Sequence, residues 1–533
     1  MQKNFNTLGA MIDCSRNAVM NLAEIERFIK LLAKMGYNQL QLYIEDTYEV
    51  DNEEFFGYKR GRYSQEELKE IVKIAEENGI EAVPCMQTLA HLKTINRWKK
   101  YEQMMDTGDT LLVGDDGVYE LIENMFASLR KCFKTDKIHI GMDEAVNLGT
   151  GKYRELHGER DRGDILLEHL NKVCVLAEKY NFKPMMWSDM FYRIANGGEY
   201  YSTETEFSAD IKEKIPENVT LVYWDYYHIK QEFYDGMLKG HKKLTDNLAF
   251  AGGAWKWNGF VPHNQLGVPA TKSALTSCIK NGVKDVFITL WGDDGAEASV
   301  YGVLPSICTA ACINIGIYDD EGIKQKFKEW TGADYDAFMT LDLPDFVEGV
   351  NPEHVINQAK FHLYNDCLLG IYDGGAVDAG DNKHYEETSA KIKAAKEKAG
   401  DYGYLFDTIG TLCDILKIKA ELGIKTRKAY KENNREELQS IVNDYDEMIK
   451  NTEKFYDVFR TQWYKENKSY GFEVQDMRLG GLIMRMKNCR KMLESYLCGE
   501  VSSVLELEEE TLKVKEEKDV IYRWEEIITA NVI

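Results

Sequence analysis

Short apolar segments alternate with amphipathic segments along the first 300 residues of the chain. Eight apolar segments have the length and composition of strands buried on both faces, and they start at Leu8, Asn38, Glu81, Lys137, Lys183, Val219, Leu248 and Asp285. Between them lie stretches such as SQEELKEIVKIAEENG, residues 64–79, whose apolar spacing and closing Gly79 predict a helix. Strand and helix alternating eight times predict an α/β fold, a (β/α)8 TIM barrel over residues 1–320.

The pattern changes near residue 320. Strand-like segments disappear, and helical periodicity rich in Lys and Glu replaces them, as in residues 434–459. Residues 321–533 are therefore predicted to form an all-helical C-terminal domain. Within it, residues 470–482 interrupt the helical pattern with glycine and mixed charge. This segment is either a loop that packs on the barrel or on a second subunit, or an ordinary connection between helices.

Composition narrows the class of protein. A length of 533 residues exceeds one ordinary domain core, and 44% hydrophobic with 11% aromatic residues is typical of a well-packed globular protein. The formal net charge of −23 argues against nucleic acid or an anionic membrane as a partner and favours a neutral substrate. Because we find neither an apolar signal segment nor a membrane-length apolar run, we expect a cytoplasmic protein.

The eleven cysteines are scattered in apolar contexts without paired CxxC spacing, which predicts reduced, buried thiols. Cys308 and Cys312 lie four residues apart, but no histidine is near them, so we expect no metal there. No metal and no organic cofactor is expected elsewhere, because the motif residues lack metal-ligand spacing.

Polar and aromatic residues gather at the predicted carboxyl ends of the strands, where the chemistry of such a barrel lies. Tryptophan follows each of the last four strands, at Trp187, Trp224, Trp255 and Trp291, and Trp257 lies two residues after Trp255. Tryptophan faces stack on flat apolar ligand surfaces while carboxylates accept hydroxyls, so these positions predict an aromatic-walled pocket. The alternative for each tryptophan taken alone is an ordinary packing role in the core.

The most specific motif is His139-Ile-Gly-Met-Asp143-Glu144, at the end of the fourth predicted strand. It resembles the H-x-G-x-D-E signature of glycoside hydrolase family 20, the β-N-acetylhexosaminidases, and the resemblance covers roughly the whole barrel. Neighbouring residues on a regular strand point to opposite faces, so the strand must end or be distorted for Asp143 and Glu144 to line one pocket. A solvated pair of acids at a strand end is the alternative.

The resemblance implies a retaining exo-glycosidase that releases terminal β-GlcNAc, β-GalNAc or both by substrate-assisted catalysis. In such a reaction the 2-acetamido oxygen of the sugar attacks C1, and no protein nucleophile is required. The resemblance implies that Glu144 is the general acid and base. It implies that Asp143 stays charged, orients the acetamido N–H and stabilises the oxazolinium intermediate.

Further positions resemble the family's binding residues. Arg16, in Asp-Cys-Ser-Arg after the first strand, resembles the arginine that grips the hydroxyls at C3 and C4, for which a forked guanidinium is suited. Asp293, in Trp-Gly-Asp, resembles the carboxylate that receives the C4 or C6 hydroxyl. His91 and Glu45 resemble a relay that supports the catalytic glutamate, with a satisfied buried histidine as the alternative. The remaining expected substrate-binding residues are His139, Trp187, Trp224, Trp255, Trp257 and Trp291.

The sequence departs from the family pattern in three places. Residues 255–258 read Trp-Lys-Trp-Asn where members usually carry a tyrosine and an aspartate, so Tyr226 or Tyr227 is the expected acetamido contact. Glu45 replaces the usual aspartate. The small α/β domain that many members carry before the barrel is expected to be absent, because the first predicted strand begins by residue 8.

Two other classes of function stay open. The barrel could be a non-catalytic sugar-binding protein, although both Asp143 and Glu144 are present. It could also be another retaining β-glycosidase, with Asp225 or Asp293 as a protein nucleophile. The expected partner is an oligosaccharide or glycoside, and a homodimer is an open alternative to a monomer.

Overall fold

Eight parallel strands close into a barrel in chain order, which confirms the predicted fold. The computed structural model describes residues 3–373, 380–512 and 523–532. The strands are β1 (Thr7–Asp13), β2 (Gln39–Tyr43), β3 (Glu81–Cys85), β4 (Lys137–His139), β5 (Lys183–Trp187), β6 (Thr220–Trp224), β7 (Leu248–Gly253) and β8 (Asp285–Leu290). Each strand pairs with the next in the chain, and β8 pairs with β1 to close the ring.

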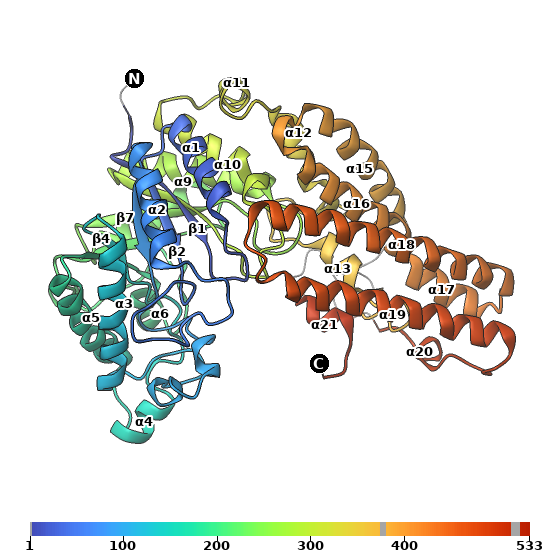
Figure 1. The fold of residues 1–533 in the computed structure, drawn as a ribbon, viewed down its shortest axis with the longest axis horizontal. Coiled ribbons are helices and arrows are strands. Elements are labelled where there is room, and N and C mark those ends of the chain that lie inside the picture. Colours follow the sequence, from blue (N-terminus) through green and yellow to red (C-terminus); the bar gives the residue numbers. More distant parts are fainter. Residues whose placement is uncertain (1–2, 374–379, 513–522, 533) are drawn as a thin grey trace.

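Helices surround this barrel (Figure 1). They are α1 (Leu22–Met35), α2 (Gln65–Glu77), α3 (Asp116–Cys132), α4 (Lys152–His157), α5 (Arg162–Lys179), α6 (Asp189–Ala195), α7 (Ile211–Lys214), α8 (Gln231–His241), α9 (Asn264–Asn281) and α10 (Leu304–Asn314). The helix predicted over residues 64–79 is α2. Its first turn is capped reciprocally, since Ser64 Oγ accepts the N–H of Glu67 and the Glu67 carboxylate accepts the N–H of Ser64.

Side chains fill the barrel interior, and a glycine on β1 makes room for the Phe287 ring of β8. A Cβ at Gly9 would lie only 2.9 Å from the Cβ of Phe287, so a side chain at this position of β1 would displace that ring. The Phe287 ring lies 5.9 Å from the Trp187 ring and 6.5 Å from the His139 ring. Phe287 is therefore part of a packed floor beneath the carboxyl ends of the strands.

From residue 320 onward, every regular element in the described residues is helical, as predicted, and this region extends away from the barrel (Figure 1). The elements are α11 (Asp320–Thr331), α12 (Tyr335–Met339), α13 (Gln358–Tyr364), α15 (Asp381–Ala395), α16 (Gly403–Lys419), α17 (Leu422–Lys431), α18 (Arg435–Glu466), α19 (Phe472–Cys498), α20 (Leu505–Glu508) and α21 (Trp524–Ile528). Helix α11 begins at Asp320, and the domain boundary proposed there stays a prediction.

The predicted interruption of the helical pattern at residues 470–482 is wrong, because α19 begins at Phe472 and continues unbroken. Gly480 and Gly481 lie in open space on this helix, and the burial of Phe472 and Leu479 outweighs the glycine penalty of about 1 kcal/mol each. Of the alternatives left open for this segment, contact with the barrel is observed at its start. A Cβ at Gly471, whose φ is +89°, would lie 2.4 Å from the carbonyl oxygen of Asn17.

All eleven cysteines are free in the structure, and all except Cys498 are buried, as the sequence predicted. Throughout the ranges that the structure describes, we find no helix with both the length and the apolar character needed to cross a membrane.

Candidate active site

A pocket at the carboxyl ends of the barrel strands brings together most of the predicted site residues. Its walls are Arg16, His91, Asp143, Glu144, Trp187, Trp224, Tyr226, Tyr227, Trp257, Trp291 and Asp293. Three other predicted residues, Glu45, His139 and Trp255, lie behind these walls and are buried. The side chains that line the pocket come from seven of the eight strand ends, which explains why residues far apart in the sequence meet here.

The backbone after β4 is distorted in a way that places two neighbouring carboxylates in one pocket. The strand ends at His139, and Gly141, Met142 and Glu144 all have positive φ values, of 72°, 71° and 51°. This confirms the predicted distortion. Positive φ is strained for a residue with a side chain, and such strain persists only where the surroundings enforce it.

Two side chains enforce this conformation. Gln87 Oε1 accepts the N–H of Met142 at 3.2 Å, and Asp189 Oδ2 accepts the N–H of Glu144 at 3.0 Å. Gln87 lies so close to the turn that a Cβ at Gly141 would be 2.0 Å from its Oε1 atom. Glycine is therefore required at position 141 both for its φ and for the space that Gln87 occupies.

Two side chains, Gln87 and His91, lie against Asp143. Its Oδ1 accepts a hydrogen bond from Gln87 Nε2 at 2.8 Å, and its Oδ2 lies 3.1 Å from His91 Nε2. Burial alone would raise the pKa of Asp143, but the charge and hydrogen bonds of His91 and Gln87 lower it to about 2. For His91 the effect of burial has the opposite sign and would lower the pKa, but Asp143 raises it to about 9. The two side chains form an ion pair at neutral pH.

Glu144 has a different environment. Nearly half of its side chain, 46%, is exposed, so its carboxylate is accessible from the pocket. Its Oε1 lies 3.4 Å from Arg193 Nη2, and its Oε2 lies 3.8 Å from His91 Nε2. Beneath it, Arg193 Nε donates to Asp189 at 2.9 Å. Desolvation and the charge of Asp143 raise the pKa of Asp189 to about 7.

Arg16 lines the pocket at the end of β1. Its guanidinium lies 3.3 Å from Asp13 and 3.4 Å from Glu45, and it stands over the ring of Trp291 at 5.4 Å. Glu45 accepts the hydroxyl hydrogen of Tyr43 at 2.9 Å. The charged partner of Glu45 in the structure is thus Arg16. A role for Glu45 in a relay to Glu144 stays a prediction.

Asp13 connects two strand ends of this wall. It accepts the N–H of Gly292 at 2.9 Å, between Trp291 and Asp293, while its other oxygen accepts the N–H of Ser15. Asp293 is the pocket carboxylate of this loop. Burial raises its pKa, and the charge of Arg16 opposes that shift.

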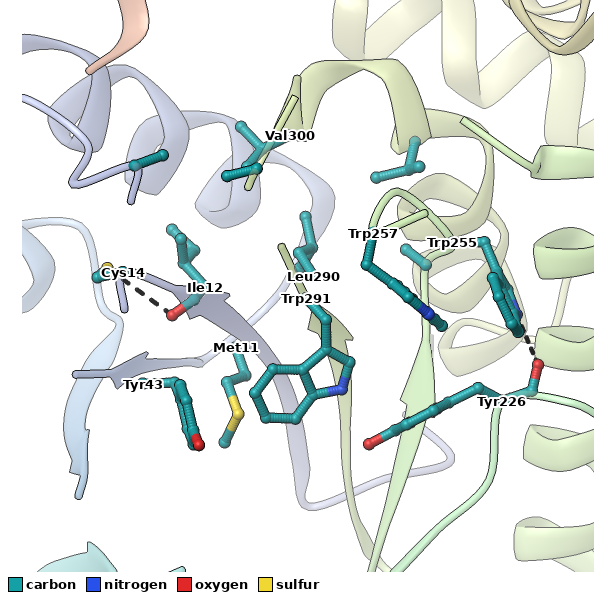
Figure 2. Close-up of a cluster of buried hydrophobic side chains, with 14 of the residues drawn as sticks. Met11, Ile12, Cys14, Tyr43, Tyr226, Trp255, Trp257, Leu290, Trp291 and Val300 are labelled. Carbon is teal, nitrogen blue, oxygen red and sulfur yellow. Dashed lines mark hydrogen bonds between the residues drawn. The ribbon is translucent and has the colours of Figure 1, made fainter. Parts of the chain in front are cut away.

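Aromatic rings form the remaining walls. Trp224 and Tyr226 stack with ring centres 5.3 Å apart, and Tyr226 meets Trp257 edge-on at 5.5 Å. Trp255 stacks behind Trp257 at 4.1 Å, and its indole N–H donates to the carbonyl of Tyr226 at 2.6 Å (Figure 2). Trp291 projects between these rings and Tyr43 (Figure 2). Trp255 therefore supports the wall instead of lining the pocket.

His139 is part of the floor. It is fully buried, its ring lies 4.3 Å from the Trp187 ring, and its Nδ1 accepts the N–H of Gly141. Burial lowers its pKa to about 3, so it is neutral at physiological pH. It contributes to the shape of the β4 end, while its predicted contact with substrate stays a prediction.

Three residues around the carboxylates are absent from the predicted set: Gln87, Asp189 and Arg193. Gln87 follows β3, and the sequence pattern places it among the polar residues at the strand ends, although no role in the site was predicted for it. Asp189 and Arg193 belong to α6, which begins two residues after β5, and the sequence gives no sign of so short a connection. In the described ranges, no three His, Cys, Asp or Glu side chains form a cluster able to hold a metal ion.

Two family models match the chain. The catalytic domain of glycosyl hydrolase family 20 matches residues 5–245, and the glycoside hydrolase 20C C-terminal domain matches residues 336–523. The first covers most of the barrel, and the second covers most of the helical region.

Curated relatives share low identity with the chain. It is 24% identical to hexosaminidase D of Homo sapiens over 220 residues, 40% of this chain and 43% of that protein. It is 23% identical to a probable β-hexosaminidase of Arthroderma benhamiae over 276 residues, 45% of this chain and 40% of that protein. The chain thus spans less than half the length of these two relatives.

Solved structures that resemble it include an exo β-N-acetylglucosaminidase from Vibrio harveyi, with a TM-score of 0.48, 13% identity and coverage of 64% of this chain and 58% of that one. A β-N-acetylhexosaminidase from Streptomyces coelicolor has a TM-score of 0.45, 17% identity and coverage of 62% and 70%. Both TM-scores are below 0.5. The two family models, in contrast, between them match both parts of the molecule. The chain belongs to glycoside hydrolase family 20.

Proposed function

We propose that the protein is an exo-acting, retaining β-N-acetylhexosaminidase that hydrolyses terminal β-GlcNAc, β-GalNAc or both through an oxazolinium intermediate. One observation carries the proposal: Asp143 and Glu144 face one pocket in different environments. Asp143 is held as an anion by His91 and Gln87, whereas Glu144 is accessible. A carboxylate fixed beside the acetamido group and an acid free to reach the glycosidic oxygen are what substrate assistance requires.

The reaction then has two steps. In the first, Asp143 accepts the acetamido N–H, the acetamido oxygen forms a bond to C1, and the bond from C1 to the leaving oxygen breaks as Glu144 donates a proton to that oxygen. In the second, Glu144 takes a proton from water, whose oxygen bonds to C1 while the bond to the acetamido oxygen breaks. Two inversions at C1 give net retention.

The other walls suit the terminal sugar. Trp187, Trp224 and Trp291 offer aromatic faces for the pyranose and the acetamido methyl group. Arg16 and Asp293 also line the pocket, and both side chains can hold sugar hydroxyls. Tyr226 and Tyr227 both line the pocket, so either hydroxyl is a candidate contact for the acetamido carbonyl.

A mechanism with Asp225 as the nucleophile has little support. Asp225 is 1% exposed and does not line the pocket, and its oxygens accept hydrogen bonds from Tyr223, at 2.7 Å, and from the N–H of Tyr227, at 3.0 Å. Its carboxylate also lies 2.9 Å from His228. Asp293 does line the pocket, and comparing substrates with and without an acetamido group tests that alternative.

We expect the protein to hydrolyse 4-nitrophenyl β-GlcNAc or β-GalNAc and to leave 4-nitrophenyl β-glucoside intact, because only the acetamido group supplies the nucleophile. Asp143→Asn should lower kcat on every acetamido substrate by a factor on the order of 10² or more. Glu144→Gln should lose about 10²–10⁴-fold on poor leaving groups and less on activated aryl glycosides. Steady-state kinetics with a thiazoline inhibitor check this. Turnover of the glucoside alone would contradict substrate assistance.

Gly141→Ala should lower kcat/KM by at least about tenfold, because the new Cβ displaces Gln87 and removes its hydrogen bond to Asp143. Gly79→Ala is the matched control. Gly79 has a φ of +71°, close to the +72° of Gly141, but nothing lies within 4 Å of its Cβ position. Kinetics and thermal unfolding of both variants separate backbone strain from loss of Gln87. Equal activity in the two variants would contradict the role of Gln87.

The Asp143–His91 pair predicts a pH-dependent stability. The pKa of His91 is raised from 6.5 to about 9, so its contribution is complete below pH 6.5 and is lost as the pH rises through about 9. The pKa of Asp143 is lowered from 3.8 to about 2, so its contribution is present above pH 3.8 and is lost towards pH 2. His91→Gln should therefore unfold a few degrees below wild type at pH 5–6 and at nearly the same temperature at pH 10. Thermal unfolding checks this, and a difference that is constant with pH would refute it.

A further inference from the structure

A second cavity adjoins the pocket on the side of Asp293. Its volume of about 450 Å³ is within the range of small-molecule sites in proteins. Tyr227, Trp257 and Asp293 belong to the walls of both cavities. The second cavity therefore lies directly beside the pocket for the terminal sugar.

Two parts of the molecule build this cavity. The loops after β7 and β8 supply the barrel wall, which includes Asn258 and Asp294. Residues 355–357, just before α13, and residues 523–525, at the start of α21, supply the facing wall. The helical C-terminal region thus reaches the edge of the candidate active site.

Specific contacts hold the facing wall in place. Asn357 Nδ2 donates to the carbonyl oxygen of Asn258 at 2.6 Å, and Trp524 Nε1 donates to Asp294 Oδ1 at 2.9 Å. The cations of Arg478 and Lys360 lie 4.5 Å and 5.0 Å from the centre of the Trp524 ring. Trp524 is therefore fixed beside the barrel loops as part of the wall.

The lining has the chemistry of a saccharide site. Aromatic rings alternate with hydrogen-bonding groups, which suits a pyranose with apolar faces and a rim of hydroxyls. The hydrogen-bonding side chains are Asn258, Asn357, Asp293, Asp294, Glu525 and Arg523. Because carboxylates outnumber the single guanidinium among them, a neutral sugar fits better than a sulfated or acidic one.

We propose that this cavity is a subsite for a second, neutral saccharide unit of the substrate, with Trp524 as a specificity-determining residue from the C-terminal region. The inference rests on the proposed hydrolase function and makes the substrate class an oligosaccharide. The second unit is the leaving-group sugar if the enzyme is strictly exo-acting, and a sugar on the 6-hydroxyl of the hexosamine if the enzyme also accepts a substituted residue. The pyranose chemistry is the same in both cases.

The test compares kcat/KM on 4-nitrophenyl β-GlcNAc, on N,N′-diacetylchitobiose and on 4-nitrophenyl β-GlcNAc that carries a glucose on its 6-hydroxyl. Trp524→Ala should lower the ratio of at least one two-sugar substrate to the simple aryl glycoside about tenfold. Trp524→Phe keeps a ring but not the indole N–H, so it should retain most of the wild-type ratio. Tyr318→Ala, an exposed aromatic outside both cavities, is the matched control and should leave the ratio unchanged.

Each outcome decides the proposal. A ratio that falls only for diacetylchitobiose identifies the leaving group as the occupant, and one that falls only for the 6-substituted glycoside identifies the substituent. An equal fall on all three substrates indicates a folding role for Trp524 and overturns the proposal, as does an unchanged ratio. If Trp524→Ala does not fold, Asn258→Phe narrows the cavity from the barrel side and should shift the same ratio. A wild-type protein inactive on all three substrates would overturn the proposed function itself.

Discussion

The candidate site depends on the left-handed turn that ends β4. In a regular strand, Asp143 and Glu144 would point to opposite faces. Positive φ values at Met142 and Glu144 turn both carboxylates into one pocket, and the hydrogen bonds from these residues to Gln87 and Asp189 hold the turn. The residue that fixes the backbone, Gln87, also binds Asp143. The same side chain, Gln87, therefore both holds the strained backbone and positions the Asp143 carboxylate.

A second constraint joins the helical region to the barrel loops. Glu297, buried in the loop after β8, accepts hydrogen bonds from Lys360 of α13, at 2.7 Å, and from Arg478 of α19, at 2.8 Å. Removing one partner of such a buried group would leave an uncompensated charge, which costs several kcal/mol. Since the same loop carries Asp293, the C-terminal region also supports the pocket wall that Asp293 forms. We infer that the two parts act as one structural unit.

Much of this arrangement could be predicted from the sequence, because burial and strand length leave a clear pattern. All eight strands and the helical region follow from periodicity. The residues that meet in the pocket are predicted from their positions at strand ends and from the resemblance to glycoside hydrolase family 20. The sequence does not reveal features that depend on how helices are oriented and packed in the folded protein. Arg193 reaches Glu144 only because α6 starts immediately after β5, and the glycines of α19 remain helical because neighbouring residues pack on the core.

The central claim is that the acetamido oxygen of the substrate is the nucleophile while Asp143 remains charged beside it. The most direct measurement is kcat/KM for 4-nitrophenyl β-GlcNAc with zero, one, two or three fluorines on the acetamido methyl group. Fluorine withdraws electrons from the carbonyl oxygen, so our account predicts a stepwise fall in rate across the series. Rates independent of fluorination would contradict it and would point to a nucleophile from the protein.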